Sequence, residues 1–291
     1  MSELSVITRE EVSEQKSMHV AIESSRAATE MQSAFLIAKK FPRDETASYN
    51  RVMTSCKRIS LATQAIYNLP ISGKNQSGPS IRLAEVLATS WGNLRFGFHE
   101  YGREDGKSSC KAFCLDLETN TNSEIDFEVE HFIEVGTKGN KSKKFISDPS
   151  ELDRLIANRG SKKLRQCILK VIPPDVVEDA MNQCKETIKK GDGSPVSDRV
   201  RKMVVAFGNL SVTQEMIEKR LGHGIDITNA DELVDLIAIY KALVDNQAKR
   251  GAYFSMSEEE TKQPSSLNEL LSTKKPEAKN EENGQTSKTE N

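Results

Sequence analysis

A short stretch near the middle of the chain concentrates side chains that bind anions. Four of the eight residues from Asn158 to Arg165 are Lys or Arg, whereas the whole chain carries 41 basic and 43 acidic residues, a formal net charge of -2. Basic side chains set in a row neutralise the phosphates of a nucleic-acid backbone. The stretch therefore predicts a local polyanion-binding site on a chain that is slightly acidic as a whole.

The positive charge extends beyond this stretch, because residues 136–173 hold ten basic residues and three acidic ones. On a helical wheel the apolar residues after Asn158 lie mainly on one side and the basic residues on the other, so a helix here has a packed face and a cationic face. Solvated surface helices show the same pattern, but the shortage of balancing acids favours a bound anion. The candidate ligands are Arg159, Lys162, Lys163, Arg165 and Lys170 on the helix, with Lys138, Lys141, Lys143 and Lys144 in the loop before it.

Three upstream residues, Arg82, Trp91 and Arg95, are further candidates for contacts with nucleic acid. Trp91 is the only tryptophan of the chain, and a base could stack on its ring beside the cation of Arg95. A single tryptophan at the end of a helix also commonly packs into the core. Both interpretations of Trp91 stay open at the level of sequence.

The segment GKNQSGPS at residues 73–80 has the outline of a phosphate-binding loop in front of a helix. Pro79 stands where such a loop needs a lysine, and the residues before it are predicted to be helical rather than a strand, so an ATPase is not expected. The free N–H groups of the following helix could hold one phosphate, and an ordinary helix start explains the segment equally well.

Carboxylates alternate with apolar residues from Glu124 to Glu130, which predicts a strand with one acidic face. Glu124, Asp126 and Glu128 could bind a divalent metal and serve a nuclease, the alternative function from a different class. A half-exposed strand explains the same pattern. No lysine of the kind that two-metal nucleases use stands next to Glu128 and Glu130 in the sequence.

Two histidines and two cysteines, His99, Cys110, Cys114 and His131, could meet in a sheet as a zinc site, but their spacing is not diagnostic of one. Buried thiols are common and explain the cysteines. No Ser-His-Asp or Cys-His arrangement is visible. We therefore predict no catalytic residues, no metal and no cofactor, and a function based on binding.

The composition narrows the setting in which the chain works. No run approaches the ~18 apolar residues of a membrane span, and the first residues lack the charged and apolar regions of a signal peptide. The five cysteines form no CxxC pair, which indicates reduced thiols in a cytoplasm. We expect a cytoplasmic protein without a membrane partner.

Hydrophobic periodicity predicts helices in the first third of the chain. Residues 1–16 are polar and are predicted to be disordered. Helices are expected over 16–40, from Asp44 to Ile66, and over 81–91, where Gly92 suits the helix end. Residues 70–80, dense in Gly, Ser and Pro, are expected to form a loop.

The pattern then changes to strands and returns to helices. Three strands of an antiparallel meander are predicted over 94–101, 108–118 and 123–135, with EDGK and TNTN turns between them. A basic loop leads into a long helix that ends at Pro173. The remaining segments are a helix over 175–190, a linker over 191–195, a helical domain over 196–254 and a disordered tail over 255–291.

This order of elements resembles the RecT/Redβ superfamily of phage single-strand annealing proteins. RGSKKLRQCILKVIPPDV looks like the basic helix, ending at proline, that closes the RecT-type core. Together with SGPSIRLAEVLATSWGNLRFGF and AFCLDLETNT, it is similar to a broad group of phage and prophage proteins that are remote members of the superfamily. The resemblance covers roughly residues 20–190.

The resemblance implies a function for the cationic helix. Annealing proteins bind one DNA strand by its backbone on an oligomeric ring or helical filament, without ATP, and leave the bases available for a complement. The resemblance implies a bacterial host cytoplasm, self-association, and contact of residues 196–291 with a phage exonuclease or host single-strand binding protein. A single-stranded DNA coating protein that does not anneal is the closer alternative.

The hydrophobic pattern and the resemblance both predict an α+β fold. It has N-terminal helices, an antiparallel β-meander and a long basic helix packed on the sheet, together forming an annealing core over residues 17–190. A small all-α domain and the tail complete the chain.

Overall fold

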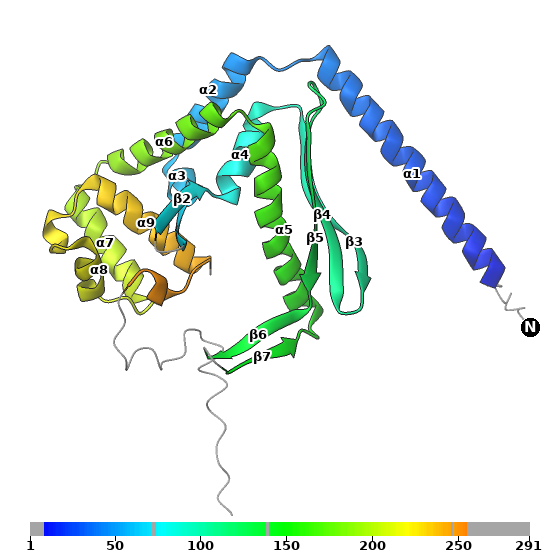
Figure 1. Cartoon of the computed structure of the whole chain (residues 1–291). Coiled ribbons are helices and arrows are strands. Elements are labelled where there is room, and N and C mark those ends of the chain that lie inside the picture. The colour runs from blue at the N-terminus through cyan, green and yellow to red at the C-terminus, as the bar shows by residue number, and fades with distance from the viewer. Residues whose placement is uncertain (1–8, 72–73, 138–139, 246, 255–291) are drawn as a thin grey trace, which may run out of the picture.

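The computed structural model describes residues 9–71, 74–137, 140–245 and 247–254 of the 291-residue chain. Its fold is α+β, as predicted, with helices packed around small antiparallel sheets (Figure 1). The helices are α1 (Arg9–Lys40), α2 (Glu45–Cys56), α3 (Ile59–Ala65), α4 (Ile81–Trp91), α5 (Pro149–Val171), α6 (Pro174–Lys190), α7 (Val196–Gly208), α8 (Gln214–Leu221), η1 (Ile225–Ile227), α9 (Ala230–Val244) and η2 (Arg250–Ala252). The strands are β1 (Ile66–Ile71), β2 (Lys74–Pro79), β3 (Leu94–Glu104), β4 (Lys107–Asp116), β5 (Asn122–Glu130), β6 (Phe132–Thr137) and β7 (Asn140–Phe145).

The central sheet consists of β3, β4 and β5 in that order, each antiparallel to its neighbour. One face of the sheet is buried under α5, which contacts all three strands. Cys110, Ala112 and Cys114 of β4 point into this interface and are fully buried. A Cβ atom at Gly160 of α5 would lie 2.5 Å from the ring of Phe98 in β3, so glycine allows the helix to approach the sheet this closely.

The main hydrophobic core lies where α2, α3, α4 and α6 pack on one another and α4 packs on α5. Leu83 and Leu87 of α4 and Ile168 of α5 are fully buried in it. The helix α4 begins as its sequence predicts, because Ser80 accepts a hydrogen bond from the backbone N–H of Leu83. It ends at Gly92, whose φ of 84° suits glycine.

The first helix, α1, extends away from the rest of the molecule (Figure 1). Ala38 near its C-terminal end is buried, whereas Met18, Val20, Ile22 and Leu36 are each more than half exposed. The helix starts at Arg9, whereas the sequence predicted disorder through residue 16; residues 1–8 lie outside the described residues. α1 therefore forms an arm with an apolar but largely uncovered surface.

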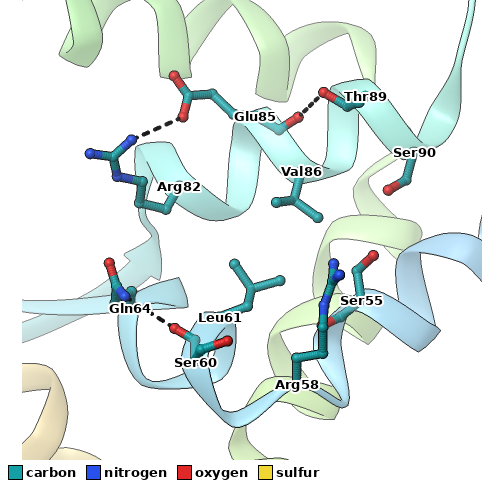
Figure 2. A pocket seen from close by; sticks show the side chains of 10 residues that line it. All are labelled: Ser55, Arg58, Ser60, Leu61, Gln64, Arg82, Glu85, Val86, Thr89 and Ser90. Atoms are coloured by element: carbon teal, nitrogen blue, oxygen red, sulfur yellow. Dashed lines mark hydrogen bonds and ion pairs between the residues drawn. The ribbon is translucent and has the colours of Figure 1, made fainter.

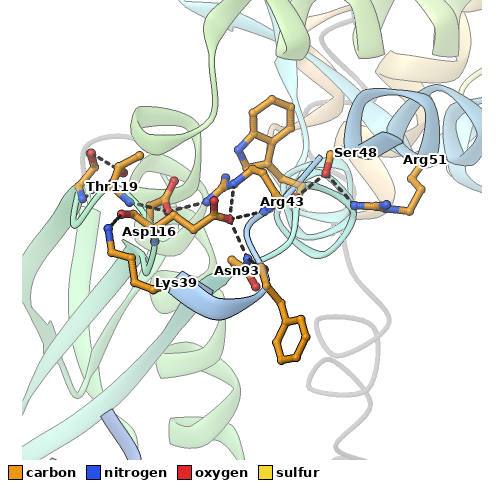
Figure 3. A network of polar contacts seen from close by, with 11 residues as sticks. Lys39, Arg43, Ser48, Arg51, Asn93, Asp116 and Thr119 are labelled. Carbon is orange, nitrogen blue, oxygen red and sulfur yellow. Dashed lines mark hydrogen bonds and ion pairs between the residues drawn. The ribbon is translucent and has the colours of Figure 1, made fainter. Parts of the chain in front are cut away.

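The base of this arm is held by a network of buried polar groups (Figure 3). Arg43 forms ion pairs with Asp116 at 2.5 Å and with Glu118 at 2.8 Å, and these three side chains are 6%, 7% and 16% exposed. Lys39 Nζ donates to the backbone oxygen of Glu118, and Asn93 Nδ2 donates to its carboxylate. Burial raises the pKa of Glu118, but the hydrogen bonds from Asn93 and Arg43 outweigh it and hold that pKa below its ordinary value. The network ties the start of α2 to the turn between β4 and β5.

The C-terminal helices α7, α8 and α9 have a core of their own, which includes Phe207, Ile217 and Ile239. Thr213 caps α8, and Asn229 forms a capping box at the start of α9. The unit also contacts the rest of the molecule, since α9 packs against β1 and α6. The hydroxyl of Tyr253 donates to the backbone oxygen of Asn68 in β1.

Three segments differ from the structure predicted for them. The single helix expected from Asp44 to Ile66 is divided at Lys57 and Arg58 into α2 and α3. Residues 66–71 and 74–79, expected to be a helix end and a loop, pair as the antiparallel strands β1 and β2. Residues 132–137 and 140–145, expected to be a strand end and a basic loop, pair as the antiparallel strands β6 and β7. The chain turns between β5 and β6 at His131, which is buried, donates its backbone N–H to Gly106 and contacts Ser108 through its ring at 2.8 Å. These contacts join residues distant in sequence, so local patterns did not reveal them.

Candidate nucleic-acid interface

The helix α5 presents the cationic face that its sequence predicts. Asp148 caps its first turn by accepting a hydrogen bond from the backbone N–H of Ser150, and Pro149 occupies the first helical position. Leu152, Leu164 and other apolar residues of the helix are buried against the sheet and α4. The opposite arc of the helix carries Arg159, Lys162, Lys163, Arg165 and Lys170.

This arc, which we call the cationic face, carries its charge without compensation. Arg159, Lys162 and Lys170 are exposed, and Lys163 and Arg165 are partly exposed. None of the five forms an ion pair with any acid in the described part of the chain. An unpaired row of cations is unfavourable on a free helix, and a bound polyanion would remove that cost.

Lys162 lies at the centre of the cationic face, with Arg159 and Arg165 three residues to either side. Protein atoms around its ammonium group remove part of its hydration, and this desolvation lowers the pKa of Lys162, with the charges of the two arginines adding to the effect. An anion placed between these residues would relieve the repulsion.

Arg165 is held in place by a contact with an aromatic ring. Its guanidinium group lies 4.6 Å from the centre of the Tyr67 ring in β1, a cation–π distance. Gly78 of β2 makes room for the same ring, since a Cβ there would lie 2.6 Å from the Tyr67 hydroxyl oxygen. The β1–β2 hairpin thus adjoins the cationic face, a neighbour that sequence analysis missed because it predicted no strand there.

The β6–β7 hairpin holds the other predicted cluster of lysines. Lys143 pairs with Glu130 at 3.6 Å, so its charge is partly compensated, whereas Lys144 is exposed and pairs with no described acid. The rings of Phe132 and Phe145 contact each other at 5.3 Å and are 40% and 52% exposed. Lys141 belongs to β7, and Lys138 lies outside the described residues.

The three upstream candidates do not join the cationic face. Trp91 is only 6% exposed and packs in the core with the guanidinium of Arg43 5.6 Å from its ring, so it offers no surface to a base. Arg95 alternates with the core-facing Phe96 and therefore projects from the sheet face opposite α5. The interpretation of Trp91 as a core residue is confirmed, and its buried ring is not open to a base stacked beside Arg95.

Arg82 lines a separate open pocket of about 550 Å³ between α4 and the α2–α3 turn (Figure 2). Leu61 and Val86 lie at its centre, and Arg58, which sequence analysis did not single out, enters it from the other side. Arg82 lies 3.7 Å from Glu85. The pocket is a surface feature formed by residues of α4, of the end of α2 and of α3.

The acidic strand does not form a metal centre in the described structure. Lys111 of β4 pairs with Glu124 at 3.1 Å and approaches Asp126 at 3.9 Å, and Lys107 pairs with Glu128 at 3.0 Å. The three acids predicted for a nuclease therefore face lysines across the sheet.

The proposed zinc ligands are also separated, because Cys110 and Cys114 point into the core whereas His99 projects from the other face. No group of three His, Cys, Asp or Glu side chains within the described ranges is arranged to hold a metal ion. In the same ranges, no helix has both the length and the apolar character needed to cross a bilayer.

The arrangement can neutralise a linear polyanion along α5, with the Tyr67 ring and the β1–β2 hairpin at one side. Its side chains are donors without acceptors, which suits phosphate oxygens rather than the edges of bases. Comparisons with protein-family models, with curated proteins and with solved structures find no match for this chain.

Proposed function

We propose that this chain binds single-stranded DNA along the cationic face of α5 and anneals complementary strands without ATP, in phage or prophage recombination. The observation that carries the proposal is the run of five basic residues on one helix with no acidic partner in the described structure. Backbone contacts of this kind hold a strand whatever its sequence and leave its bases free to pair. The resemblance of the helix to the closing helix of the RecT-type core supports annealing over simple coating.

Self-association is part of the proposal, because annealing needs a groove that continues over many nucleotides. The arm α1 supports it, since helices in proteins derive most of their stability from packing and α1 leaves Met18, Val20 and Ile22 exposed. Residues 196–291 are proposed to contact an exonuclease or a host single-strand binding protein. The setting would be the cytoplasm of a bacterial host cell.

Charge reversal on the cationic face tests the proposal. Arg159→Glu, Lys162→Glu and Lys170→Glu together should weaken binding to a labelled oligonucleotide by roughly a hundredfold or more at low salt. The matched control reverses three exposed lysines of the C-terminal unit, Lys202, Lys219 and Lys249, and should bind like the parent chain. Circular dichroism shows whether each variant is folded. Undiminished binding by the folded α5 variant would move the site elsewhere.

Two further measurements identify the activity. If one subunit holds about four phosphates, the logarithm of the binding constant should fall with the logarithm of salt concentration with a slope of roughly -2.8. Complementary labelled oligonucleotides should form a duplex in the presence of the protein, with EDTA and without ATP. Binding without duplex formation would indicate a coating protein, and cleavage that EDTA abolishes would indicate a nuclease.

A further inference from the structure

The described chain ends in the C-terminal unit, which two successive contacts through β1 connect to the cationic face. Tyr253 donates a hydrogen bond to the backbone oxygen of Asn68, the residue after Tyr67. The ring of Tyr67 in turn lies 4.6 Å from the guanidinium of Arg165. Two contacts therefore connect the last described residues to the cations of α5, and the chain continues from Phe254 at this place.

The segment that follows carries its negative charge close to this point. Residues 255–271 contain four acids and one lysine, a net charge of -3, and three of the acids are the consecutive Glu258, Glu259 and Glu260. Residues 272–291 contain four acids and four lysines, a net charge of zero. The tail thus has an acidic first part and a neutral second part.

The acidic part is long enough to reach the cationic face. An extended chain spans about 3.3 Å per residue, so the six residues from Ser255 to Glu260 cover roughly 20 Å. All of residues 255–271 cover on the order of 55 Å. A segment tethered this close acts at an effective concentration in the millimolar range, which makes even weak charge pairs significant.

We propose that residues 255–271 dock in cis on the cationic face of α5, with Glu258–Glu260 against Arg159, Lys162 and Arg165, and that DNA must displace them to bind. The inference rests on the proposed function in that DNA is the competitor, but the docking itself does not require DNA. The carboxylates of the tail pair with the same cations that bind the DNA phosphates. The docked tail lowers the apparent affinity for DNA. Short strands, which make few phosphate contacts, therefore bind poorly, whereas longer strands make enough contacts to displace the tail.

Neutralising the acids in the full chain tests the competition. Glu258→Gln, Glu259→Gln and Glu260→Gln together should tighten oligonucleotide binding about three- to tenfold at 50 mM salt, because the tail no longer occupies the site. The difference should vanish near 1 M salt, where the screening length falls to about 3 Å. The matched control, Glu277→Gln, Glu281→Gln and Glu282→Gln, changes the net charge equally and should bind like the parent chain. Equal affinities for all three proteins, or an equal gain in both variants, would overturn the docking.

A second measurement needs no DNA. A fluorescent peptide of residues 255–271 should bind the full-chain Glu258–Glu260 variant at low salt, as followed by anisotropy. It should fail to bind when Arg159→Glu, Lys162→Glu and Lys170→Glu are added. Peptide binding without any DNA binding would refute the proposed function and keep the tail contact, whereas DNA binding without peptide binding would refute the tail contact alone. A gain in DNA affinity that disappears on dilution of the protein would indicate a tail donated by another copy and would contradict docking in cis.

Discussion

The acidic strand β5 and the basic helix α5 hold the most segregated charge in the sequence, and the structure treats them oppositely. Glu124, Asp126 and Glu128 face Lys111 and Lys107 on the neighbouring strand β4. The five cations of the cationic face form no ion pair with any acid in the described chain. The acids of β5 pair with lysines on the neighbouring strand, whereas the cationic face of α5 has the Tyr67 ring beside it but no acidic partner among the described residues.

The sequence of α5 places no acidic residue where it could pair with Lys162. On an α-helix, charges interact with residues three and four positions away. For Lys162 those positions hold Asn158, Arg159, Arg165 and Gln166, none of them acidic. Segregated charge in the sequence is therefore compensated on β5 and left open on α5, and only the open charge is free to bind a ligand.

The largest effect on stability is expected where ion pairs are buried, at the base of α1, in contrast to the exposed pairs of β5 and the unpaired cations of α5. Arg43→Met leaves Asp116 and Glu118 buried without their cation, and we expect a loss of about 3–5 kcal/mol in the free energy of unfolding. Urea denaturation followed by circular dichroism measures this loss. Arg26→Met removes pairs to Glu23 and Glu30 that are more than half exposed, and it should change stability little. Equal losses in the two variants would mean that burial does not govern these pairs.

A smaller effect distinguishes paired from unpaired lysines by its sign. Lys162→Gln removes a cation that two arginines repel, so the free energy of unfolding should rise by about 0.3 kcal/mol at low salt. Lys111→Gln removes the partner of Glu124 and Asp126, and the thermal midpoint should fall. Both differences should shrink in 1 M salt. A fall in stability for Lys162→Gln would show that the cationic face is compensated after all.

The smallest effect concerns an ion pair that pH can switch. His223 Nε2 lies 2.8 Å from Glu232, and this hydrogen bond raises the pKa of His223 above 6.5 and lowers that of Glu232 below 4.5. The contribution of His223 is complete below about pH 6.5 and is lost as pH rises through its raised pKa. The contribution of Glu232 is present above about pH 4.5 and is lost as pH falls through its lowered pKa.

Together these two shifts place the greatest stabilisation between about pH 4.5 and 6.5. His223→Gln should therefore lower the thermal midpoint more at pH 5.5 than at pH 8, as measured by scanning calorimetry. An equal reduction at both values would attribute the effect to lost packing rather than to the charge of the imidazole.

Local sequence was enough to predict the elements whose signals are local. The helix start at Asp44, the helix end at Gly92 and the EDGK hairpin all involve residues within a few positions of each other. The faces of α5 followed from periodicity for the same reason. The hairpin β1–β2 was missed because its pairing needs Tyr67 opposite Gly78, and nothing near Tyr67 in the sequence shows that partner.

The sequence predicted the residues of α5 that form the candidate site, but it did not predict the elements that contact them. The helical periodicity of the apolar residues predicted which side of α5 is buried, and Arg159, Lys162 and Lys170 lie on the opposite, exposed side. The contact of Arg165 with Tyr67 joins residues about a hundred positions apart, and the burial of Trp91 depends on Arg43 and the core of four helices. Such contacts come from tertiary packing, for which this single sequence carries no local signal.

The arm α1 also determines how the molecule moves and scatters. A helix of 32 residues is about 48 Å long, whereas a compact chain of 291 residues has a radius of gyration of roughly 19 Å. A rod of that length, fixed at one end by Lys39 and Arg43, makes the free chain an elongated particle whose rotational diffusion is slow about axes across the rod. Burying the arm between copies would make the particle more compact for its mass, so the frictional ratio reports directly on whether the arm is covered.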